Sequence, residues 1–299
     1  MIYPAPLKKG DKIAIVSPAS HIRHEYVDAA CRIIEQWGYK PVVGEHCKGA
    51  TGTYSGTVEE RLADLRAAFT DKSVKAILCS RGGYGVVQLL EALGTEILRD
   101  NPKWVIGFSD ISAMHAAMLT AGVMSLHAPM TKQFATLGAE DECVKLLRGI
   151  IEGEKPEYCE PAHLFNRKGI AEGEIVGGNM AVLCGLQGSR YNILTADKIL
   201  FIEDIGEAVY KVERMLYNLR LNGVLQGLRG LIVGRFTEYT NPDGNGENME
   251  QMVSRMVAPY GYPVAFDFPV GHIDRNLPII EGAEVRLEVA AATTTLSFK

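Results

Sequence analysis

A serine follows an apolar stretch in the first half of the sequence, where Ser109 and Asp110 come just after Trp104–Gly107. A serine hydroxyl is a weak nucleophile at neutral pH, so acyl-transfer chemistry needs a base, an orienting carboxylate and donors for the oxyanion. Gly107 leaves room for a sharp turn that would lift the hydroxyl above a sheet edge. Ile111 replaces the last glycine of the G-x-S-x-G pattern. A second interpretation therefore stays open, in which Ser109 or Asp110 caps the next helix.

A carboxylate and a histidine in the second half of the chain could complete this chemistry. Glu203 and Asp204 end an apolar run that begins at Lys198. A shielded glutamate at that point could hold the Nδ1 proton of a histidine and stabilise its imidazolium. His272 follows a proline and a glycine in a constrained loop, which suits a positioned base. The alternative is that Glu203, Asp204 and Glu207 only end the strand in a solvated turn.

The run Arg81, Gly82, Gly83, Tyr84 and Gly85 also has two interpretations. Its glycines could bring backbone N–H groups to an oxyanion, while Arg81 grips a substrate carboxylate as a bidentate fork. The run could equally be no more than a tight turn between a strand and a helix. It lacks the spacing of a dinucleotide-binding loop, and the chain has no Walker A loop.

Composition narrows the class of ligand. A net charge of −5 with no basic block gives no electrostatic case for nucleic acid or an anionic membrane. The six cysteines form no C-x-x-C pair, and the seven histidines form no H-E-x-x-H pattern, so we expect no metal, no cofactor and no disulfide. We expect His115 and His127 to be core residues, and the histidines in polar surroundings to be exposed: His21, His24, His46 and His163. The start of the chain lacks an apolar signal segment, so we expect a cytoplasmic protein.

Strand-like and helix-like patterns alternate in the first half of the chain, which predicts an α/β fold with a parallel, Rossmann- or flavodoxin-like sheet over residues 1–152. The helical pattern of residues 58–69 places Arg61, Asp64 and Arg66 outside. The ends of parallel strands share one rim of the sheet, so Ser17, residues 81–85 and Ser109 should face the same side. The expected strands are residues 12–17, 41–43, 75–79 and 104–107, and the expected helices are residues 25–37, 58–69 and 86–93.

A polar segment with two prolines, residues 153–168, is interpreted as a linker. Beyond it, residues 169–299 predict a second, mixed α/β domain with β-barrel-like character and a terminal hairpin over residues 284–298. The expected strands are residues 173–176, 198–203, 230–235 and 285–289, and the expected helices are residues 180–186, 210–222 and 249–260.

With these pieces assembled, the sequence resembles the LD-carboxypeptidase family of serine peptidases, which includes the microcin C self-immunity peptidases. The resemblance is nearly end to end. The residues that match the family pattern are Val16-Ser17-Pro18, Arg61 with Asp64-Leu65, residues 81–85, residues 107–111, Gly177-Gly178-Asn179, residues 201–204, Gly271-His272 and Asn276-Leu277-Pro278.

The resemblance implies roles for these residues. Ser109 would be the nucleophile, Glu203 the orienting acid and His272 the general base, while the backbone N–H groups of Gly83 and Asp110 would bind the oxyanion. It also implies that D-alanine is removed from the murein tetrapeptide L-Ala-γ-D-Glu-diaminopimelate-D-Ala in cytoplasmic peptidoglycan recycling, without a metal and by a homodimer. Arg81 remains a candidate partner for the substrate carboxylate.

Two departures from the family pattern affect the substrate more than the reaction: His127-Ala128-Pro129-Met130 replaces His-Gly-Pro-Met, and Ala208-Val209-Tyr210 replaces Pro-Pro-Tyr. Two alternatives stay open. One is a self-immunity peptidase acting on aminoacyl-nucleotide analogues, which would need an aromatic shelf for the base; Trp37 and Trp104 lie outside the region where such a shelf is expected. The other is a ligand-binding α/β protein without catalysis.

Overall fold

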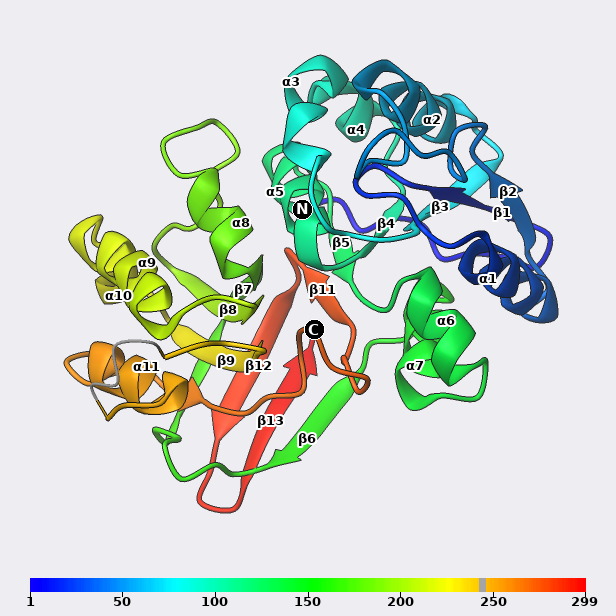
Figure 1. The fold of residues 1–299 in the computed structure, drawn as a ribbon. Coiled ribbons are helices and arrows are strands. Elements are labelled where there is room, and N and C mark those ends of the chain that lie inside the picture. Colours follow the sequence, from blue (N-terminus) through cyan, green and yellow to red (C-terminus); the bar gives the residue numbers. More distant parts are fainter. Residues whose placement is uncertain (242–245) are drawn as a thin grey trace. The chain divides into compact units, whose positions relative to one another are not determined.

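The computed structural model describes residues 1–241 and 246–299 (Figure 1). These residues form two compact units. The N-terminal unit comprises Met1–Glu154 and Asp274–Glu281, and the C-terminal unit comprises Lys155–Ile273 and Gly282–Lys299. Each unit builds its own sheet with helices around it, which confirms the predicted α/β class.

The sheet of the N-terminal unit has six strands in the order β11-β5-β4-β3-β1-β2. All neighbours pair in parallel except β11, which is antiparallel to β5. The central strands are apolar and buried because a parallel sheet is covered by helices on its faces. This confirms the predicted parallel sheet. The strands are β1 (Lys12–Val16), β2 (Lys40–Val43), β3 (Val74–Cys79), β4 (Trp104–Gly107), β5 (Ser125–His127) and β11 (Ile279–Glu281).

Helices lie between these strands in the chain. Some of them contact one another: α1 contacts α6, and α2 contacts α3 and α4 (Figure 1). The helix expected over residues 86–93 is instead a 3-10 turn, η1 (Val86–Gln88), followed by the short helix α3. Two adjacent valines, which are β-branched, begin that segment and weaken its helical preference. The helices are α1 (His24–Gln36), α2 (Val58–Thr70), α3 (Leu90–Leu93), α4 (Glu96–Asp100), η2 (Ser109–Ile111), α5 (Ser112–Thr120), α6 (Thr131–Leu137) and α7 (Glu142–Ile151).

The prediction that Arg61 and Asp64 face outward from α2 was wrong, whereas Arg66 is exposed as expected. Arg61 and Asp64 are buried, with 2% and 7% of their surfaces exposed. Buried charges need hydrogen-bond partners. Backbone carbonyls accept from Arg61, and the backbone and ring of His46 donate to Asp64. Helical periodicity reports which face of a helix is apolar. It does not reveal that the folded chain supplies hydrogen-bond partners for a buried charged side chain.

The sheet of the C-terminal unit has seven strands in the order β10-β9-β8-β7-β12-β13-β6. Strands β7 to β10 pair in parallel, while β12, β13 and β6 pair antiparallel, and β12 with β13 forms the predicted terminal hairpin. This confirms the mixed sheet. The strands are β6 (Glu157–Pro161), β7 (Gly169–Asn179), β8 (Lys198–Ile205), β9 (Gly230–Thr237), β10 (Val264–Ala265), β12 (Glu284–Val289) and β13 (Thr293–Phe298).

The two edges of this sheet are drawn together. Arg167, in the segment between β6 and β7, forms an isolated antiparallel bridge with Val264 of the opposite edge strand β10. The ring of Tyr158 on β6 packs near that of Phe268, with centroids 6.4 Å apart. The sheet therefore curves toward barrel-like closure. The helices beside it are α8 (Met180–Gly185), α9 (Val209–Leu221), α10 (Val224–Gly227) and α11 (Met249–Val257).

Two segments bear on the expected domain boundaries, which stay a prediction. Residues 153–168 include the edge strand β6, and residues 155–168 belong to the C-terminal unit. Residues 274–281 return to the N-terminal unit, where β11 pairs with β5.

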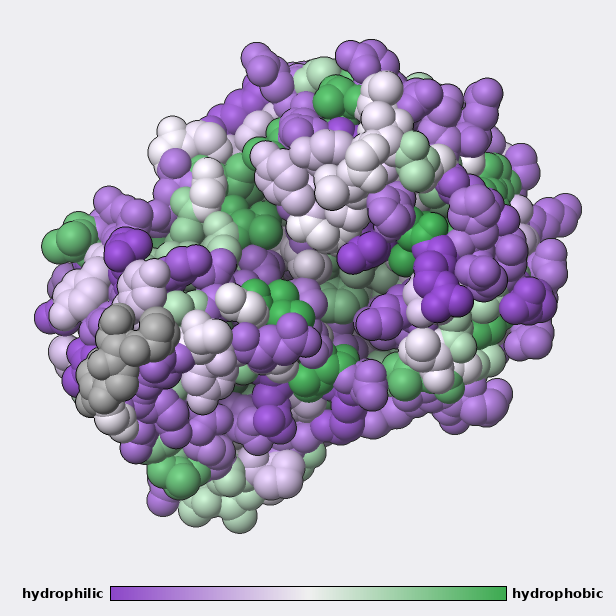
Figure 2. Space-filling view, in the orientation of Figure 1, coloured by the Kyte–Doolittle hydropathy of each residue, from purple (hydrophilic) through white to green (hydrophobic). Residues whose placement is uncertain are grey.

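Hydrophilic side chains cover most of the face shown in Figure 2. Among the described residues, no helix combines the length and apolarity needed to cross a membrane.

Candidate active site

Ser109 is the first residue of η2, at the sharp turn that follows β4. Its φ of 67° is in the left-handed region, where a residue with a Cβ carries about 1–2 kcal/mol of steric cost. Such strain is concentrated at functional sites. Neither η2 nor α5 begins with a side-chain cap, and the carboxylate of Asp110 accepts from Val86 N at 2.9 Å, in another segment. The described contacts therefore do not support the helix-cap interpretation of this turn.

The glycine turn, residues 82–85, packs directly on the serine turn. A Cβ added to Gly82 would lie 2.7 Å from the Cβ of Ser109 and 2.8 Å from its Oγ, so only glycine fits there. Ser20 braces the other side, because its backbone N donates to Gly82 O and its Oγ accepts from Tyr84 N. The turns that follow the neighbouring strands β3 and β4 therefore meet at one rim, as expected from the sheet topology.

Asp110 has a buried carboxyl group next to the candidate nucleophile. Burial raises the pKa of Asp110, although the Val86 N–H group, the charge of Arg61 and the Gly85 N–H group each act to lower it. Arg81 is exposed and donates from Nη1 to His21 O at 3.0 Å. Its role toward a substrate carboxylate stays a prediction.

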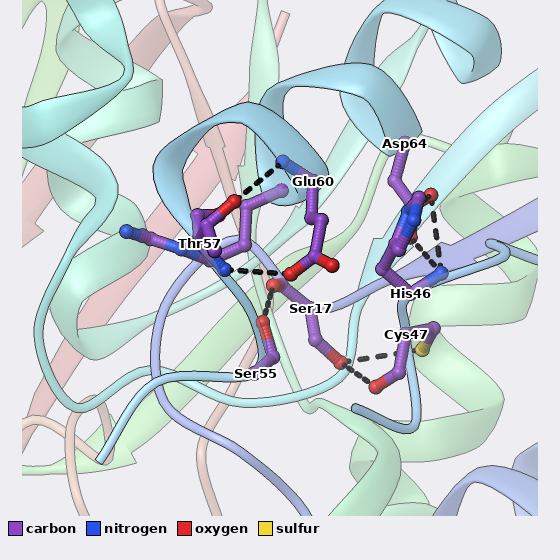
Figure 3. Close-up of polar contacts among 8 residues, drawn as sticks. Ser17, His46, Cys47, Ser55, Thr57, Glu60 and Asp64 are labelled. Atoms are coloured by element: carbon purple, nitrogen blue, oxygen red, sulfur yellow. Dashed lines mark hydrogen bonds and ion pairs between the residues drawn. The ribbon is translucent and has the colours of Figure 1, made fainter. Parts of the chain in front are cut away.

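Buried hydroxyl groups join the ends of β1 and β3, where Ser17 Oγ lies 2.5 Å from Ser80 Oγ. Ser17 Oγ also donates to the carbonyl oxygen of Cys47, 2.6 Å away, and Ser55 Oγ donates to the carbonyl oxygen of Ser17 (Figure 3). Ser17 therefore reaches the expected edge but is buried with a structural role. Figure 3 also shows that His46, expected to be exposed, hydrogen-bonds through Nδ1 to Asp64 at 3.0 Å.

In the C-terminal unit, Glu203 and His272 form a hydrogen-bonded pair. Glu203 lies near the carboxyl end of β8 with none of its surface exposed, and its Oε2 is 2.7 Å from His272 Nδ1. Beside it, between Val233 and Phe236, β9 spans one residue more than β8 does between the partner residues Ile202 and Asp204. Bulges of this kind re-aim side chains next to functional sites. Since Glu203 is fully buried, the solvated-turn interpretation of this residue was wrong.

The loop before His272 is anchored to β9. Arg235 N donates to Val270 O at 2.9 Å, and Arg235 forms an isolated parallel bridge with Gly271. Gly271 has a φ of 128°, and an added Cβ would lie 3.0 Å from both the Cβ and the Oε2 of Glu203. The close approach of this backbone to Glu203 therefore requires a glycine beside the histidine.

The environment of His272 favours its charged form. Burial acts to lower the pKa of His272, but the hydrogen bond to Glu203 and the negative charges of Glu203, Asp204 and Glu238 outweigh it, and the pKa is raised. A carboxylate on Nδ1 fixes the ring orientation and stabilises the imidazolium. The pair can therefore act as a base that holds the proton it accepts.

Asp204 and Asn179 form a second buried pair, 25 residues apart in the sequence. Asp204 Oδ1 accepts from Asn179 Nδ2 at 2.9 Å, and Oδ2 accepts from Ala181 N at 2.9 Å in the first turn of α8. Burial raises the pKa of Asp204 to about 6. Asn179 directly precedes the helix expected over residues 180–186, but no local signal in the sequence joins it to a carboxylate on the next strand.

In the described part of the chain, no group of three or more His, Cys, Asp or Glu side chains is placed to hold a metal ion. The fold and the chemistry-bearing residues thus define a two-unit α/β protein with a strained serine in one unit and an acid–imidazole pair in the other.

Comparison with known families identifies this protein as a member of the LD-carboxypeptidase family. The family's N-terminal domain matches residues 13–128, and its C-terminal domain matches residues 172–287. The resemblance inferred from the sequence is confirmed.

Three similar proteins show the range of this family. A probable murein peptide carboxypeptidase of Bacillus subtilis is 30% identical over 98% of this chain and 93% of its own. The crystal structure of a muramoyltetrapeptide carboxypeptidase from Oxalobacter formigenes matches with a TM-score of 0.87 and 26% identity, over 96% of this chain and 98% of its own. The microcin C7 self-immunity protein MccF of Escherichia coli is 26% identical over 95% of this chain and 92% of its own.

Proposed function

We propose that this protein is a metal-independent serine LD-carboxypeptidase that removes the terminal D-Ala from L-Ala-γ-D-Glu-diaminopimelate-D-Ala. The observation that carries the proposal is the strained Ser109 in one unit together with the buried Glu203–His272 pair in the other. Relatives named for murein peptides support the substrate class. In this proposal Ser109, Glu203 and His272 act together as a catalytic triad.

The proposed reaction is acyl transfer in two halves. Since Nδ1 of His272 is engaged by Glu203, Nε2 takes the Ser109 proton while Oγ attacks the carbonyl carbon of the L-centre of diaminopimelate. The C–N bond then breaks, and D-Ala leaves with that proton on its amine. Water, deprotonated by His272, attacks the acyl-enzyme ester, and the proton returns to Ser109 Oγ as the tripeptide leaves.

Backbone donors would stabilise the tetrahedral oxyanion. We assign this role to the N–H groups of Gly83 and Asp110, because their turns pack against each other around Ser109. A donor of this kind lowers the barrier by about 3 kcal/mol in comparable enzymes. The exposed Arg81 is the candidate partner for the D-Ala carboxylate, since a paired charge discriminates more strongly than a methyl pocket.

The test is release of D-Ala from the tetrapeptide, measured by mass spectrometry with EDTA present. Wild-type protein and Ser73→Ala, a change at an exposed serine of the same unit, should release D-Ala, and Ser109→Ala should not. Release by Ser109→Ala at the wild-type rate would remove Ser109 from the reaction. Absence of release from the wild type would remove the substrate.

The first alternative is a self-immunity-type peptidase acting on aminoacyl-nucleotide analogues. Trp37 and Trp104 are buried, with 4% and 0% exposure, so neither offers an open ring for a base. This observation favours the muropeptide. If the wild type cleaves an aminoacyl sulfamoyl adenosine and leaves the tetrapeptide intact, the alternative replaces our proposal.

The second alternative is a binding protein without catalysis. A fluorophosphonate probe separates the two, because an activated serine reacts and an ordinary one does not. Labelling of wild type and its loss in Ser109→Ala would support the enzyme.

We further propose that the protein works in the cytoplasm, in peptidoglycan recycling, as a homodimer. Light scattering of the purified chain tests the oligomeric state.

A further inference from the structure

One peptide group of the N-terminal unit is held from both sides by oppositely charged side chains. The carbonyl oxygen of Gly85 accepts a hydrogen bond from Arg61 Nη1 at 3.0 Å. The N–H of Val86, which belongs to the same peptide group, donates to Asp110 Oδ2 at 2.9 Å. Hydrogen bonds to charged groups are stronger than neutral ones, and bonds in a chain polarise one another. We call this arrangement the Arg61–Asp110 bridge.

Arg61 is built to hold backbone. With 2% of its surface exposed, it donates from Nη1 to Pro18 O at 2.8 Å and from Nη2 to Gln88 Oε1 at 2.6 Å. Its guanidinium lies 4.9 Å from the ring centroid of Tyr54. Among the described residues, no carboxylate lies within salt-bridge distance of it. A buried cation is costly unless its donors are used. Here Nη1 and Nη2 hold Pro18, Gly85 and Gln88, and Nε donates to backbone carbonyls at the start of α2.

Gly85 makes this contact possible. Its φ is 134°, and an added Cβ would lie 2.6 Å from Arg61 Nη1. The last glycine of the turn therefore admits a guanidinium, whereas the first glycine, Gly82, admits Ser109. The two ends of one short turn are fixed by two different close approaches.

The bridge reaches the candidate nucleophile through Asp110. Asp110 follows Ser109 in the chain, so the carboxylate that holds Val86 N–H is part of the serine turn itself. The glycine turn is thus tied to the serine turn at both ends, by packing at Gly82 and by the bridge at Val86. Gly83, whose N–H group we assign to the oxyanion, lies in the chain between these two contacts.

We propose that Arg61 is a positioning residue for the reaction, which acts through the Gly85–Val86 peptide and Asp110 to hold the glycine turn in register with Ser109. This inference rests on the proposed function, because the register matters for the oxyanion donors. Arg61 touches no reacting atom, so its effect is on geometry. A misplacement of about 1 Å remote from the chemistry can cost about 100-fold in rate.

The kinetic test compares Arg61→Met, Arg61→Lys and the control Arg66→Met, a change at an exposed arginine that lies further along α2. We expect Arg61→Met to lower kcat for D-Ala release about 100-fold with KM within about twofold. Arg61→Lys keeps the charge but lacks the planar fork, so it should recover part of the loss. Arg66→Met should match wild type. A folded Arg61→Met protein with wild-type kcat would overturn the inference.

A double-variant cycle tests the bridge. Asp110→Asn should also lower kcat, and since both changes release the same peptide, Arg61→Met with Asp110→Asn should be little worse than the poorer single variant. Losses that multiply would show that the two residues act separately, which contradicts the bridge.

Amide hydrogen exchange tests the bridge without any substrate. The Val86 N–H group should exchange at least about 10-fold faster in Arg61→Met, Arg61→Lys and Asp110→Asn, and at the wild-type rate in Arg66→Met. Unchanged exchange in all variants would refute the inference even if D-Ala is released. The two tests can give different answers. If the variants exchange faster but the wild type releases no D-Ala, the Arg61–Asp110 bridge is supported and the function proposed above is refuted. If Arg61→Met does not fold, Arg61→Lys carries both measurements.

Discussion

Glu203 Oε2 lies 2.7 Å from His272 Nδ1, and the carboxylate that makes this contact is wholly buried. Its second oxygen, Oε1, is also buried and has no hydrogen-bond partner among the described residues. The carboxylate therefore makes its hydrogen bond through Oε2, the oxygen that faces the imidazole. This arrangement makes the protonation of His272 the property most sensitive to Glu203.

The first prediction concerns pH. A general base must be neutral to accept a proton, so kcat/KM of the wild type should rise with pH through the raised pKa of His272. Glu203→Gln removes the charge that raises this pKa, so the acid limb should move to lower pH. The plateau should fall about 100- to 10,000-fold, because the imidazolium is no longer stabilised. A pH–rate profile of D-Ala release measures both effects.

Glu238→Gln is the matched control, since Glu238 raises the pKa of His272 through its charge without a hydrogen bond to the ring. It should move the limb slightly in the same direction and leave the plateau near wild type. An acid limb that stays in place in Glu203→Gln would mean that another group controls the pH dependence.

The second prediction concerns the strain at Ser109. Because its φ is 67°, Ser109→Gly should be more stable to unfolding than Ser109→Ala by about 1 kcal/mol. Ser112, three residues on, has an ordinary helical φ of −53°, and there the order should reverse, with alanine more stable than glycine by about 1 kcal/mol. Urea unfolding of the four variants gives the comparison. The same order at both positions would argue against the left-handed turn.

The third prediction concerns the packing of the glycine turn. Gly82→Ala places a Cβ 2.7 Å from that of Ser109, so the serine or the turn must shift. We expect D-Ala release to fall about 100-fold in a protein that still folds. Gly185→Ala is the control, because an added Cβ there meets nothing within 4 Å. Circular dichroism confirms folding, and a fully active Gly82→Ala protein would show that the contact is unimportant.

The fourth prediction concerns stability. Burial raises the pKa of Asp204 to about 6, whereas an aspartate in an unfolded chain titrates near about 3.9. The unfolded chain therefore ionises first as pH rises, and this residue should destabilise the fold progressively between about pH 4 and pH 6, by roughly 1.4 kcal/mol per unit of pKa difference. Above pH 6 the full penalty remains.

Asp204→Asn removes that titration, so the stability of wild type relative to this variant should decline across the window. Asp71→Asn is the control that should show no change across this window, because hydrogen bonds from Ser73 lower the pKa of Asp71, so this residue is ionised in both the folded and the unfolded chain above about pH 4.5. Urea unfolding at pH 4.5 and 7 measures the differences. Parallel pH dependence in wild type and Asp204→Asn would rule out the raised pKa.

The sequence by itself determined the class of fold and the family. Alternating apolar periods predicted the parallel sheet of the N-terminal unit and the terminal hairpin of the C-terminal unit, because burial against a neighbouring layer imposes a period of two or 3.6 on each element. Ser109 and Glu203 stand out in the sequence as polar residues at the ends of apolar runs, and His272 stands out because it follows a proline and a glycine in a constrained loop. Their joint role as a triad stays a prediction.

Only the tertiary structure decided how these residues are held. The strain at Ser109, the burial of Arg61 and the contact of Glu203 with a histidine 69 residues away depend on partners that no local pattern encodes. Periodicity reports how apolar a face is, and it misplaced Arg61 and Asp64 because a buried charge is permitted wherever the fold supplies its hydrogen bonds. Those bonds come from loops distant in sequence, so they exist only once the chain has folded.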